Sequence, residues 1–200
     1  SGEQSGALIL GLVESLAVAG VLWVSVDRVS MMCADLMMRR ARLFGPLLAS
    51  GCEVLISGKG TRRVRLFDGE RALVGNATAK RRREFTETRL LAHEALRRIG
   101  YDGQLKGSDG ELLWPSGIVG SLSHCPSLCV AAVASAERIR AVGVDVDDSD
   151  GLSDGIMRFM FSSEELASLR MASSVERRAA FCAKEAAEGV VRIGRDGGLP

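Results

Sequence analysis

The hydrophobic and polar positions of the chain follow two different periods in its central part. Across residues 70–99, apolar side chains recur at three- and four-residue intervals, which is the spacing of a helix with one buried face, and Gly100 marks its end. After a loop rich in Gly, Asp and Ser, apolar and β-branched residues form short runs at 118–124, 128–135 and 139–147. The pattern therefore predicts one long helix followed by three consecutive strands.

Shorter elements are predicted on either side of this core. Residues 52–57 and 64–67 have the character of two short strands around a turn. Residues 31–45, 162–170 and 175–192 have helical patterns, and the second of these begins with a serine cap and acidic residues in its first turn. Helices before and after a run of linked strands favour an α+β fold over a doubly wound sheet.

Residues 7–26 form an apolar stretch about as long as a membrane span. In a transmembrane helix Glu14 would lie near mid-depth, where an unpaired carboxylate is costly. Glu3 is the only charge before the stretch, so the basic leading region of a signal peptide is missing. A buried N-terminal extension is the favoured interpretation, and a membrane-tethered protein is the alternative.

Composition limits the classes of partner. The chain has 200 residues, enough for one domain or two small halves, and 26 basic against 25 acidic side chains give a net charge of +1. The overall charge therefore indicates no nucleic-acid or membrane partner. Five cysteines without a paired spacing favour reduced thiols in a cytoplasmic protein.

The segment GVDVDDSD, residues 143–150, is the first with candidate chemistry. Asp145 and Asp147 are two residues apart on a predicted strand, so both carboxylates point to one face. Two close carboxylates repel each other unless a cation or hydrogen bonds hold them, and Mg²⁺ takes such ligands together with phosphate oxygens and water. An acidic surface turn is the other interpretation.

Two further segments contain candidate ligand-binding groups. His124 ends a predicted strand, where it is either a phosphate or base contact or a histidine satisfied within its loop. A zinc site with Cys125 and Cys129 would lack a second ligand pair. The basic cluster of residues 79–89 is either a solvated helix face or a site for a small polyphosphate, and it lacks the interleaved aromatic residues typical of nucleic-acid binding.

A lysine and a glutamate stand side by side in the alanine-rich run FCAKEAAEGVV, residues 181–191. Lys184 and Glu185 are either a solvated pair on a helix surface or a pair of which one member faces inward. The run alone leaves both interpretations open.

Four segments together resemble the 4′-phosphopantetheinyl transferases of the siderophore and surfactin type. The ordered motifs WP-G-GSLSH, GVDVD and F-x-x-KEA carry the resemblance, which covers roughly residues 46–188. The matching segments are GERALVGNATAKRRREFTETRLLAHEALRRIG (69–100), WPSGIVGSLSHC (114–125), AVGVDVDD (141–148) and FCAKEA (181–186).

The resemblance implies an enzyme that transfers the phosphopantetheine arm of coenzyme A to a serine of an apo acyl or peptidyl carrier protein, releasing adenosine 3′,5′-bisphosphate. It implies an α+β fold of two similar α/β halves related by pseudo-twofold symmetry, with coenzyme A between them and a monomer as the unit. Residues 1–45 would be an extension outside the match, 46–116 the N-terminal half, and 117–200 a C-terminal half that is incomplete or divergent at its end.

The resemblance also implies roles for individual residues. Asp145, Asp147 and Glu185 match the ligands of Mg²⁺, and Glu185, or a water that it orients, matches the general base. Lys184 matches a group that steadies the phosphate. The positions that match coenzyme A contacts are Arg83, Arg89, Ser123, His124 and Lys184.

The chain departs from the family pattern at three points. Asp147 stands where glutamate is more common, and Gly189 stands where the family has a phosphate-binding lysine. The chain ends in VRIGRDGGLP without the apolar strands that usually follow. These departures motivate an alternative, a relative that binds coenzyme A or a carrier protein with little turnover.

Overall fold

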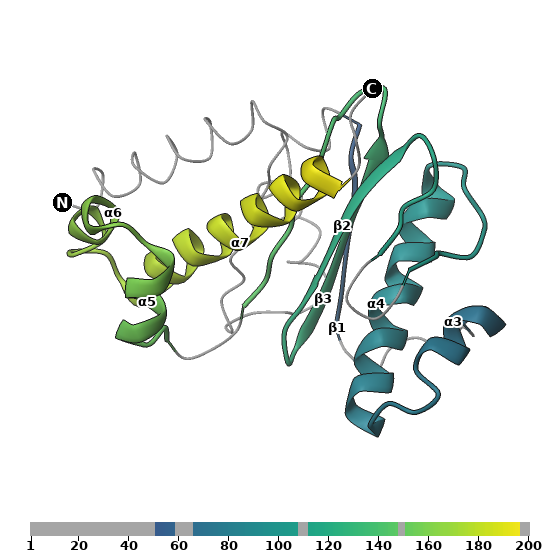
Figure 1. The fold of residues 1–200 in the computed structure, drawn as a ribbon, viewed down its shortest axis with the longest axis horizontal. Coiled ribbons are helices and arrows are strands. Elements are labelled where there is room, and N and C mark those ends of the chain that lie inside the picture. Colours follow the sequence, from purple (N-terminus) through teal and green to yellow (C-terminus); the bar gives the residue numbers. More distant parts are fainter. Residues whose placement is uncertain (1–50, 59–65, 108–111, 148–150, 197–200) are drawn as a thin grey trace.

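The computed structural model describes residues 51–58, 66–107, 112–147 and 151–196 (Figure 1). A small antiparallel sheet lies between helices in this part of the chain, which confirms the α+β class. The elements are β1 (Glu53–Gly58), α3 (Asp68–Leu73), α4 (Ala79–Arg98), β2 (Ile118–His124), β3 (Leu128–Ser135), α5 (Asp154–Met160), α6 (Ser163–Ser168) and α7 (Ser174–Asp196).

The sheet has the strand order β1-β3-β2, and both pairings are antiparallel. β3 is the central strand and is buried along almost its whole length. The sheet therefore joins β1, from before the predicted boundary at residue 116, to β2 and β3, which come after it.

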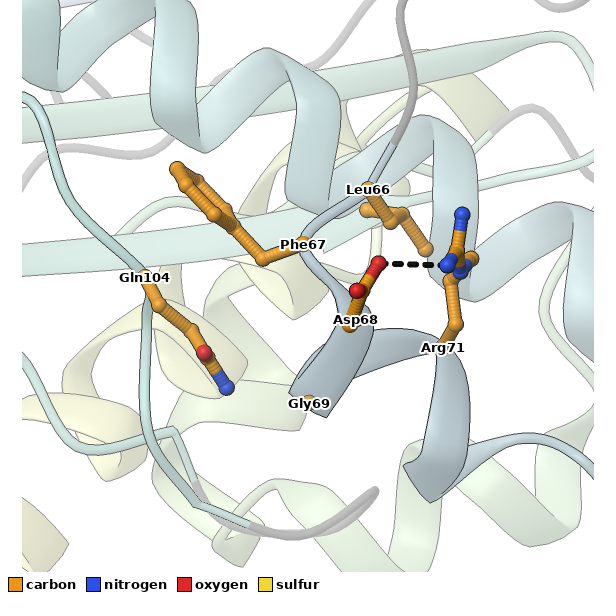
Figure 2. Close-up of a pocket in the computed structure, with 6 residues that line it drawn as sticks. All are labelled: Leu66, Phe67, Asp68, Gly69, Arg71 and Gln104. Carbon is orange, nitrogen blue, oxygen red and sulfur yellow. Dashed lines mark hydrogen bonds and ion pairs between the residues drawn. The ribbon is translucent and has the colours of Figure 1, made fainter.

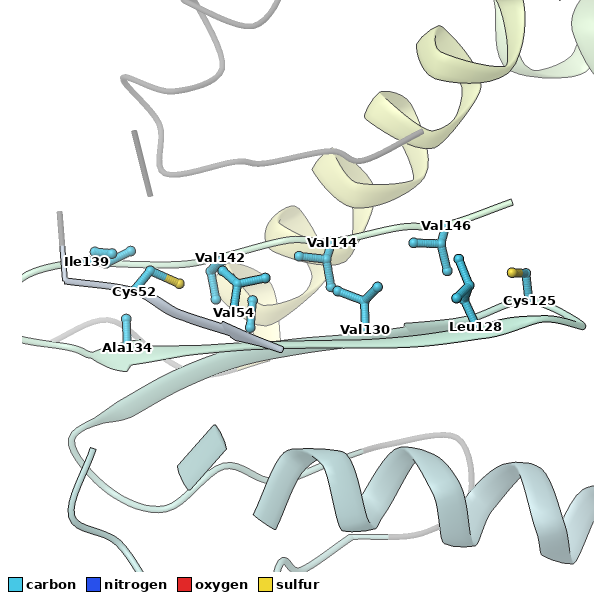
Figure 3. Packing of buried hydrophobic residues seen from close by; sticks show 11 residues of the cluster. Cys52, Val54, Cys125, Leu128, Val130, Ala134, Ile139, Val142, Val144 and Val146 are labelled. Carbon is cyan, nitrogen blue, oxygen red and sulfur yellow. The ribbon is translucent and has the colours of Figure 1, made fainter. Parts of the chain in front are cut away.

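The two faces of the sheet carry two separate apolar clusters. Cys129, Ala131 and Val133 of β3 face α4, where they pack with the buried leucines and alanines of that helix. Val130 and Ala134 point the other way, because successive side chains of a strand alternate between faces (Figure 3). Covering both faces explains why β3 is an unbroken apolar run rather than an alternating one.

The predicted strand at 139–147 is wrong in detail. The segment does not join the sheet by backbone pairing, and it lies across the face opposite α4 (Figure 3). Its valines at 142, 144 and 146 nevertheless alternate as in a strand and are buried against Val130 and its neighbours. The period-two pattern is present because an extended segment packed on the face of a sheet alternates buried and exposed side chains, as a strand within the sheet does.

The predicted helix at 70–99 is two helices. α3 ends at Leu73, and α4 begins after Thr78, whose side-chain oxygen accepts a hydrogen bond from the Arg81 backbone N–H. Gly75 and Asn76 lie between them, and both residue types are unfavourable inside helices. The break lets α3 fold back so that Glu70 meets α4.

Tight backbone geometry positions β2. Gly117 adopts φ of 78° in the turn that precedes the strand, a conformation that favours glycine. Gly120 lies under Trp114, and a Cβ at Gly120 would be 2.6 Å from the indole ring. The motif WPSGIVGS thus encodes a turn and an indole packed directly on a strand.

The C-terminal helices form a third apolar cluster. Met157, Phe161 and Leu169 are buried between α5, α6 and α7, with Phe181 packed against them. The pattern at 162–170 correctly predicted α6 and its serine cap, and the structure adds reciprocal hydrogen bonds between Ser162 and Glu165. α5 was not predicted.

Several predicted elements fall partly or wholly outside the described residues. These are the apolar stretch 7–26, the helix 31–45 and residues 64–65 of the predicted strand 64–67, whose last two residues precede α3 without strand structure. In the part of the chain that the structure describes, none of the helices has the length and apolar character needed to cross a membrane.

Candidate functional site

Asp145 and Asp147 lie on the outer side of the 139–147 segment. The flanking valines point into the sheet, so the alternation turns both carboxylates away from it. Both aspartates are half-buried. The predicted arrangement of two carboxylates on one face is therefore present, although a strand ladder does not create it.

Serine side chains of β2 hold this segment in place. The hydroxyls of Ser121 and Ser123 each accept a backbone N–H, from Val144 and Val146 respectively, at 3.1 Å. Ser123 Oγ also donates to Asp145 Oδ1 at 2.7 Å. Ser123, predicted to lie beside a nucleotide, is thus a bridge between β2 and the first carboxylate.

One stripe of α7 faces the carboxylates. Arg178 Nε lies 3.9 Å from Asp147 Oδ2, and the thiol of Cys182 donates a hydrogen bond to Asp145. Burial, reinforced by the negative charge of Asp145, raises the pKa of Cys182, so the group stays a neutral thiol donor. Positions four apart share one face of a helix, which explains why these two residues meet the same segment.

Glu185 continues this stripe by helical spacing, because it lies seven residues after Arg178 and three after Cys182. Its side chain is exposed in the structure. Within the described ranges, no group of three or more His, Cys, Asp or Glu side chains is positioned to hold a metal. Helical register places Glu185 on the side of the aspartates, while the three carboxylates are not gathered into one cluster.

Lys184 lies on a different face of α7. Its Nζ donates to the Met160 carbonyl at 2.8 Å and to Glu165 Oε2 at 2.6 Å, and it lies 4.9 Å from the centre of the Phe161 ring. The hydrogen bond from Lys184 holds the pKa of Glu165 below its usual value. The adjacent Lys184 and Glu185 therefore face different surroundings, the first toward α5 and α6.

His124 ends β2 and is half-buried, with Nε2 3.8 Å from Glu84 Oε2 of α4. Arg83, next to Glu84, is exposed. The alternative zinc site is unsupported because Cys125 packs on one face of the sheet and Cys129 on the other. The four cysteines of the described ranges are buried and form no disulfide bond.

Arg89 belongs to a separate buried cluster on α3 and α4. Its guanidinium lies 3.7 Å from Glu70 Oε1 and donates to the Lys106 carbonyl at 3.5 Å. Both carboxylate oxygens of Glu70 lie 2.9 Å from His93 Nε2. Arg89 was predicted to contact coenzyme A, and in the structure its charge is directed to Glu70.

A cavity of about 610 Å³ opens beside α3 (Figure 2). Gln104 approaches Gly69 so closely that a Cβ there would lie 2.2 Å from the amide nitrogen. The Phe67 ring meets His93 edge-on at 5.0 Å, which links the cavity wall to the buried cluster. The lining residues are Leu66, Phe67, Asp68, Gly69, Arg71 and Gln104.

Sequence reasoning missed residues that complete these clusters. Arg178 and Cys182 have a readable signal, because they precede Glu185 at helical spacing on one face. Glu165 has one as well, as the third residue of a capping box. Glu70 and His93 have no such signal, since their meeting depends on the break between α3 and α4.

The aspartate pair suits a divalent cation by its donor set. Asp145 and Asp147 offer hard oxygen ligands on one side of an extended segment, and Mg²⁺ needs only one or two protein carboxylates when phosphate and water complete its shell. The nearby Arg178 and Cys182 act as hydrogen-bond or charge partners rather than ligands. The residues present therefore fit Mg²⁺ bound with a phosphate-bearing ligand.

Comparison with known proteins shows what the chain is similar to. Residues 69–134 match the family described as the 4′-phosphopantetheinyl transferase N-terminal domain. This part of the chain is therefore similar to the N-terminal domain of the 4′-phosphopantetheinyl transferases. The match begins at Gly69 and runs through α4, β2 and most of β3, and it confirms the resemblance predicted from the motifs.

Individual relatives agree. The 4′-phosphopantetheinyl transferase PptT of Mycobacterium tuberculosis is 38% identical over 122 residues, which are 58% of this chain and 54% of that protein. The transferase Npt of Nocardia iowensis is 36% identical over 121 residues, again 58% of this chain and 54% of the relative. Enterobactin synthase component D of Shigella flexneri is 32% identical over 137 residues, covering 64% of this chain and 63% of that protein. The chain spans about half the length of the first two of these relatives.

Proposed function

We propose that this protein transfers the 4′-phosphopantetheine arm of coenzyme A to a serine of an apo acyl or peptidyl carrier protein, releasing adenosine 3′,5′-bisphosphate. The supporting observation is the pair Asp145 and Asp147, held by β2 serines and faced by the stripe of α7 that leads to Glu185. The relatives named as phosphopantetheinyl transferases support the same reaction class.

In the proposed reaction Asp145 and Asp147 hold Mg²⁺, with Glu185 as the third carboxylate. When bound, the ion neutralises charge on the pyrophosphate during transfer. Ser123 orients Asp145 through its 2.7 Å hydrogen bond, and Cys182 provides a second donor to the same carboxylate. These contacts fix the carboxylate before the ligand arrives.

Glu185 is the proposed acceptor of the proton from the carrier serine, directly or through a water that it orients. Its exposed position on α7 leaves it accessible to a second protein. A carboxylate that must accept a proton from an incoming hydroxyl benefits from this access.

Coenzyme A is the proposed ligand of the basic residues around β2 and α4. His124 and Arg83 are in suitable places, at the end of β2 and on the exposed side of α4. Arg89 would contact a phosphate by exchanging part of its interaction with Glu70. Lys184 would likewise exchange Glu165 for the phosphate, because its amine is held toward α6.

The proposal includes the remaining features of the family. We infer two similar halves related by pseudo-twofold symmetry, with coenzyme A between them, and a monomer acting in the cytoplasm. The buried cysteines of the described residues form no disulfide bond, which is compatible with a reducing compartment.

The test is a mass-shift assay with coenzyme A, Mg²⁺ and several apo carrier proteins. The arm's mass should appear on the carrier, and Asp145→Asn and Glu185→Gln should each lower the rate by about 10²–10³-fold because each removes charge from the transfer site. Glu137→Gln is the matched control, since Glu137 is exposed on the turn after β3, and it should transfer normally. Absence of any mass shift with permissive carriers would contradict the proposal.

A second candidate function is binding of coenzyme A or a carrier without turnover. Gly189, which stands where the family has a lysine, favours it. Calorimetry separates the two functions, because coenzyme A binding without any transfer would support the binding protein alone. Gly189→Lys should then restore transfer if the missing charge is the cause.

A further inference from the structure

Arg178 is an unusual neighbour for a pair of aspartates expected to bind a cation. Arg178 is only 6% exposed, and its Nε makes no hydrogen bond with any atom of the described residues. A buried guanidinium without full hydrogen bonding is costly, so its charge requires compensation nearby. The carboxylate of Asp147 is the charge partner that the structure gives it.

The contact between these two groups is a long one. Nε and Oδ2 are 3.9 Å apart, which is within ion-pair range and too far for a hydrogen bond. The guanidinium therefore compensates the charge of Asp147 without the paired hydrogen bonds that an arginine can form with a carboxylate. Little directional bonding would be lost if another cation took over this compensation.

We propose that Arg178 is a built-in counter-cation of the aspartate pair, which compensates Asp147 when no metal is bound and weakens divalent-cation binding while it stays close. This inference rests on the proposed metal site at Asp145 and Asp147. Arg178 is a positioning residue that touches neither substrate nor reacting atoms. A guanidinium carries a positive charge, so Arg178 competes with a divalent cation for the same carboxylate.

The consequence is a tuned metal affinity. Two carboxylates on one side of a segment attract a divalent cation, and a fixed positive charge about 4 Å from one of them reduces that attraction. The site would then bind Mg²⁺ strongly only when coenzyme A adds its own negative phosphates. Such an arrangement couples occupancy by metal to the presence of the phosphate-bearing ligand.

Direct binding of Mn²⁺ to the whole chain, without coenzyme A or carrier protein, tests the inference. Mn²⁺ bound to protein is separated from free ion by electron paramagnetic resonance. R178Q should bind Mn²⁺ roughly tenfold more tightly than the unaltered chain because the competing charge is gone. R177Q is the matched control, because the neighbouring Arg177 donates instead to the Arg170 carbonyl, and its affinity should change less than about twofold.

Two additional variants separate the possible failures. R178K keeps the positive charge, so its affinity for Mn²⁺ should stay within about threefold of that of the unaltered chain. If R178Q fails to fold, R178K takes its place in the test. Tighter Mn²⁺ binding by R178K would then count against the inference. If Asp145→Asn leaves Mn²⁺ binding unchanged, or the unaltered chain binds none, the proposed metal site is wrong and the inference falls with it. If the unaltered chain binds Mn²⁺ through Asp145 and R178Q binds it equally or less tightly, the inference alone is overturned.

Discussion

Two charge clusters lie on opposite sides of the same small sheet, and each combines an arginine with carboxylates. On the α4 side, Glu70 is completely buried, forms an ion pair with Arg89 and is hydrogen-bonded to His93. On the α7 side, Asp145 and Asp147 are only half-buried, with Arg178 as the charge partner of the second. The Glu70 carboxylate is enclosed by the protein, whereas those of Asp145 and Asp147 are partly accessible to solvent.

The two clusters differ in how deeply their carboxylates are buried. Both oxygens of Glu70 are within 2.9 Å of the His93 ring nitrogen, and the Phe67 backbone N–H donates to Oε2 at 3.3 Å. Asp145 accepts a hydrogen bond from Ser123 Oγ at 2.7 Å, and Arg178 Nε lies 3.9 Å from Asp147 Oδ2. A fully buried carboxylate bonded within the protein stabilises a fold, whereas half-buried carboxylates keep part of their surface accessible to a ligand.

The largest expected effect is on the enclosed cluster. Glu70→Gln leaves Arg89 buried without its charge partner, and it should lower the free energy of unfolding by about 3 kcal/mol in urea denaturation. Asp68→Asn, on the exposed side of α3, should change it by less than about 0.5 kcal/mol. If Glu70→Gln lowered the free energy of unfolding no more than Asp68→Asn, the buried Glu70 cluster would not stabilise the fold as described.

A second substitution perturbs the α4 face alone. Gly120→Ala places a methyl group 2.6 Å from the Trp114 ring, so it should cost about 1–3 kcal/mol of stability by overpacking. Gly151→Ala is the control, because a Cβ at Gly151 meets nothing within 4 Å. Thermal unfolding measures both, and equal midpoints would show that the indole can move aside.

A smaller effect is expected on the aspartate side. Ser121→Ala removes the hydroxyl that accepts the Val144 N–H, and it should cost about 1 kcal/mol and speed exchange of that amide hydrogen. Ser116→Ala, in the exposed turn before β2, should leave both unchanged. Hydrogen exchange followed by nuclear magnetic resonance measures the amide directly, and continued protection of Val144 would assign its hydrogen bond elsewhere.

The smallest effect concerns the most open ion pair. Glu165→Gln weakens the contact with Lys184, and at neutral pH it should cost about 0.5 kcal/mol, since both side chains are partly exposed. Lys184 lowers the pKa of Glu165, so this stabilisation exists above the ordinary glutamate pKa and disappears as pH falls through the lowered value. Denaturation at several pH values should show the difference between parent and variant closing in acid. A difference that stays constant between neutral and acidic pH would contradict this assignment.

The sequence was informative wherever a local pattern determines the structure. The capping box at Ser162, the turn glycine at 117 and the alternating valines before Asp145 each follow from residues near one another in the chain. The motif WP-G-GSLSH lies within the residues 69–134 that match the family description, which confirms the resemblance predicted from the ordered motifs. The roles predicted for Arg83 and His124 stay predictions.

Contacts between distant segments were not predictable in the same way. Glu70 meets His93 only because Gly75 and Asn76 interrupt a stretch whose apolar spacing continues through them. The 139–147 segment has the alternation of a strand, and alternation does not distinguish pairing within a sheet from lying on one. Lys184 turns toward Glu165 because α5 and α6 precede α7 and pack against it, and α5 gave no usable signal.

The two serine hydroxyls of β2 set the register of the 139–147 segment against the sheet. Ser121 and Ser123 are spaced by two residues, and so are the amides of Val144 and Val146 that they hold. A two-point attachment with matching spacing defines a register, and a shift by one residue would turn both carboxylates toward the sheet. The spacing of two serine hydroxyls on β2 therefore fixes which residues of the 139–147 segment carry their side chains on the outer side.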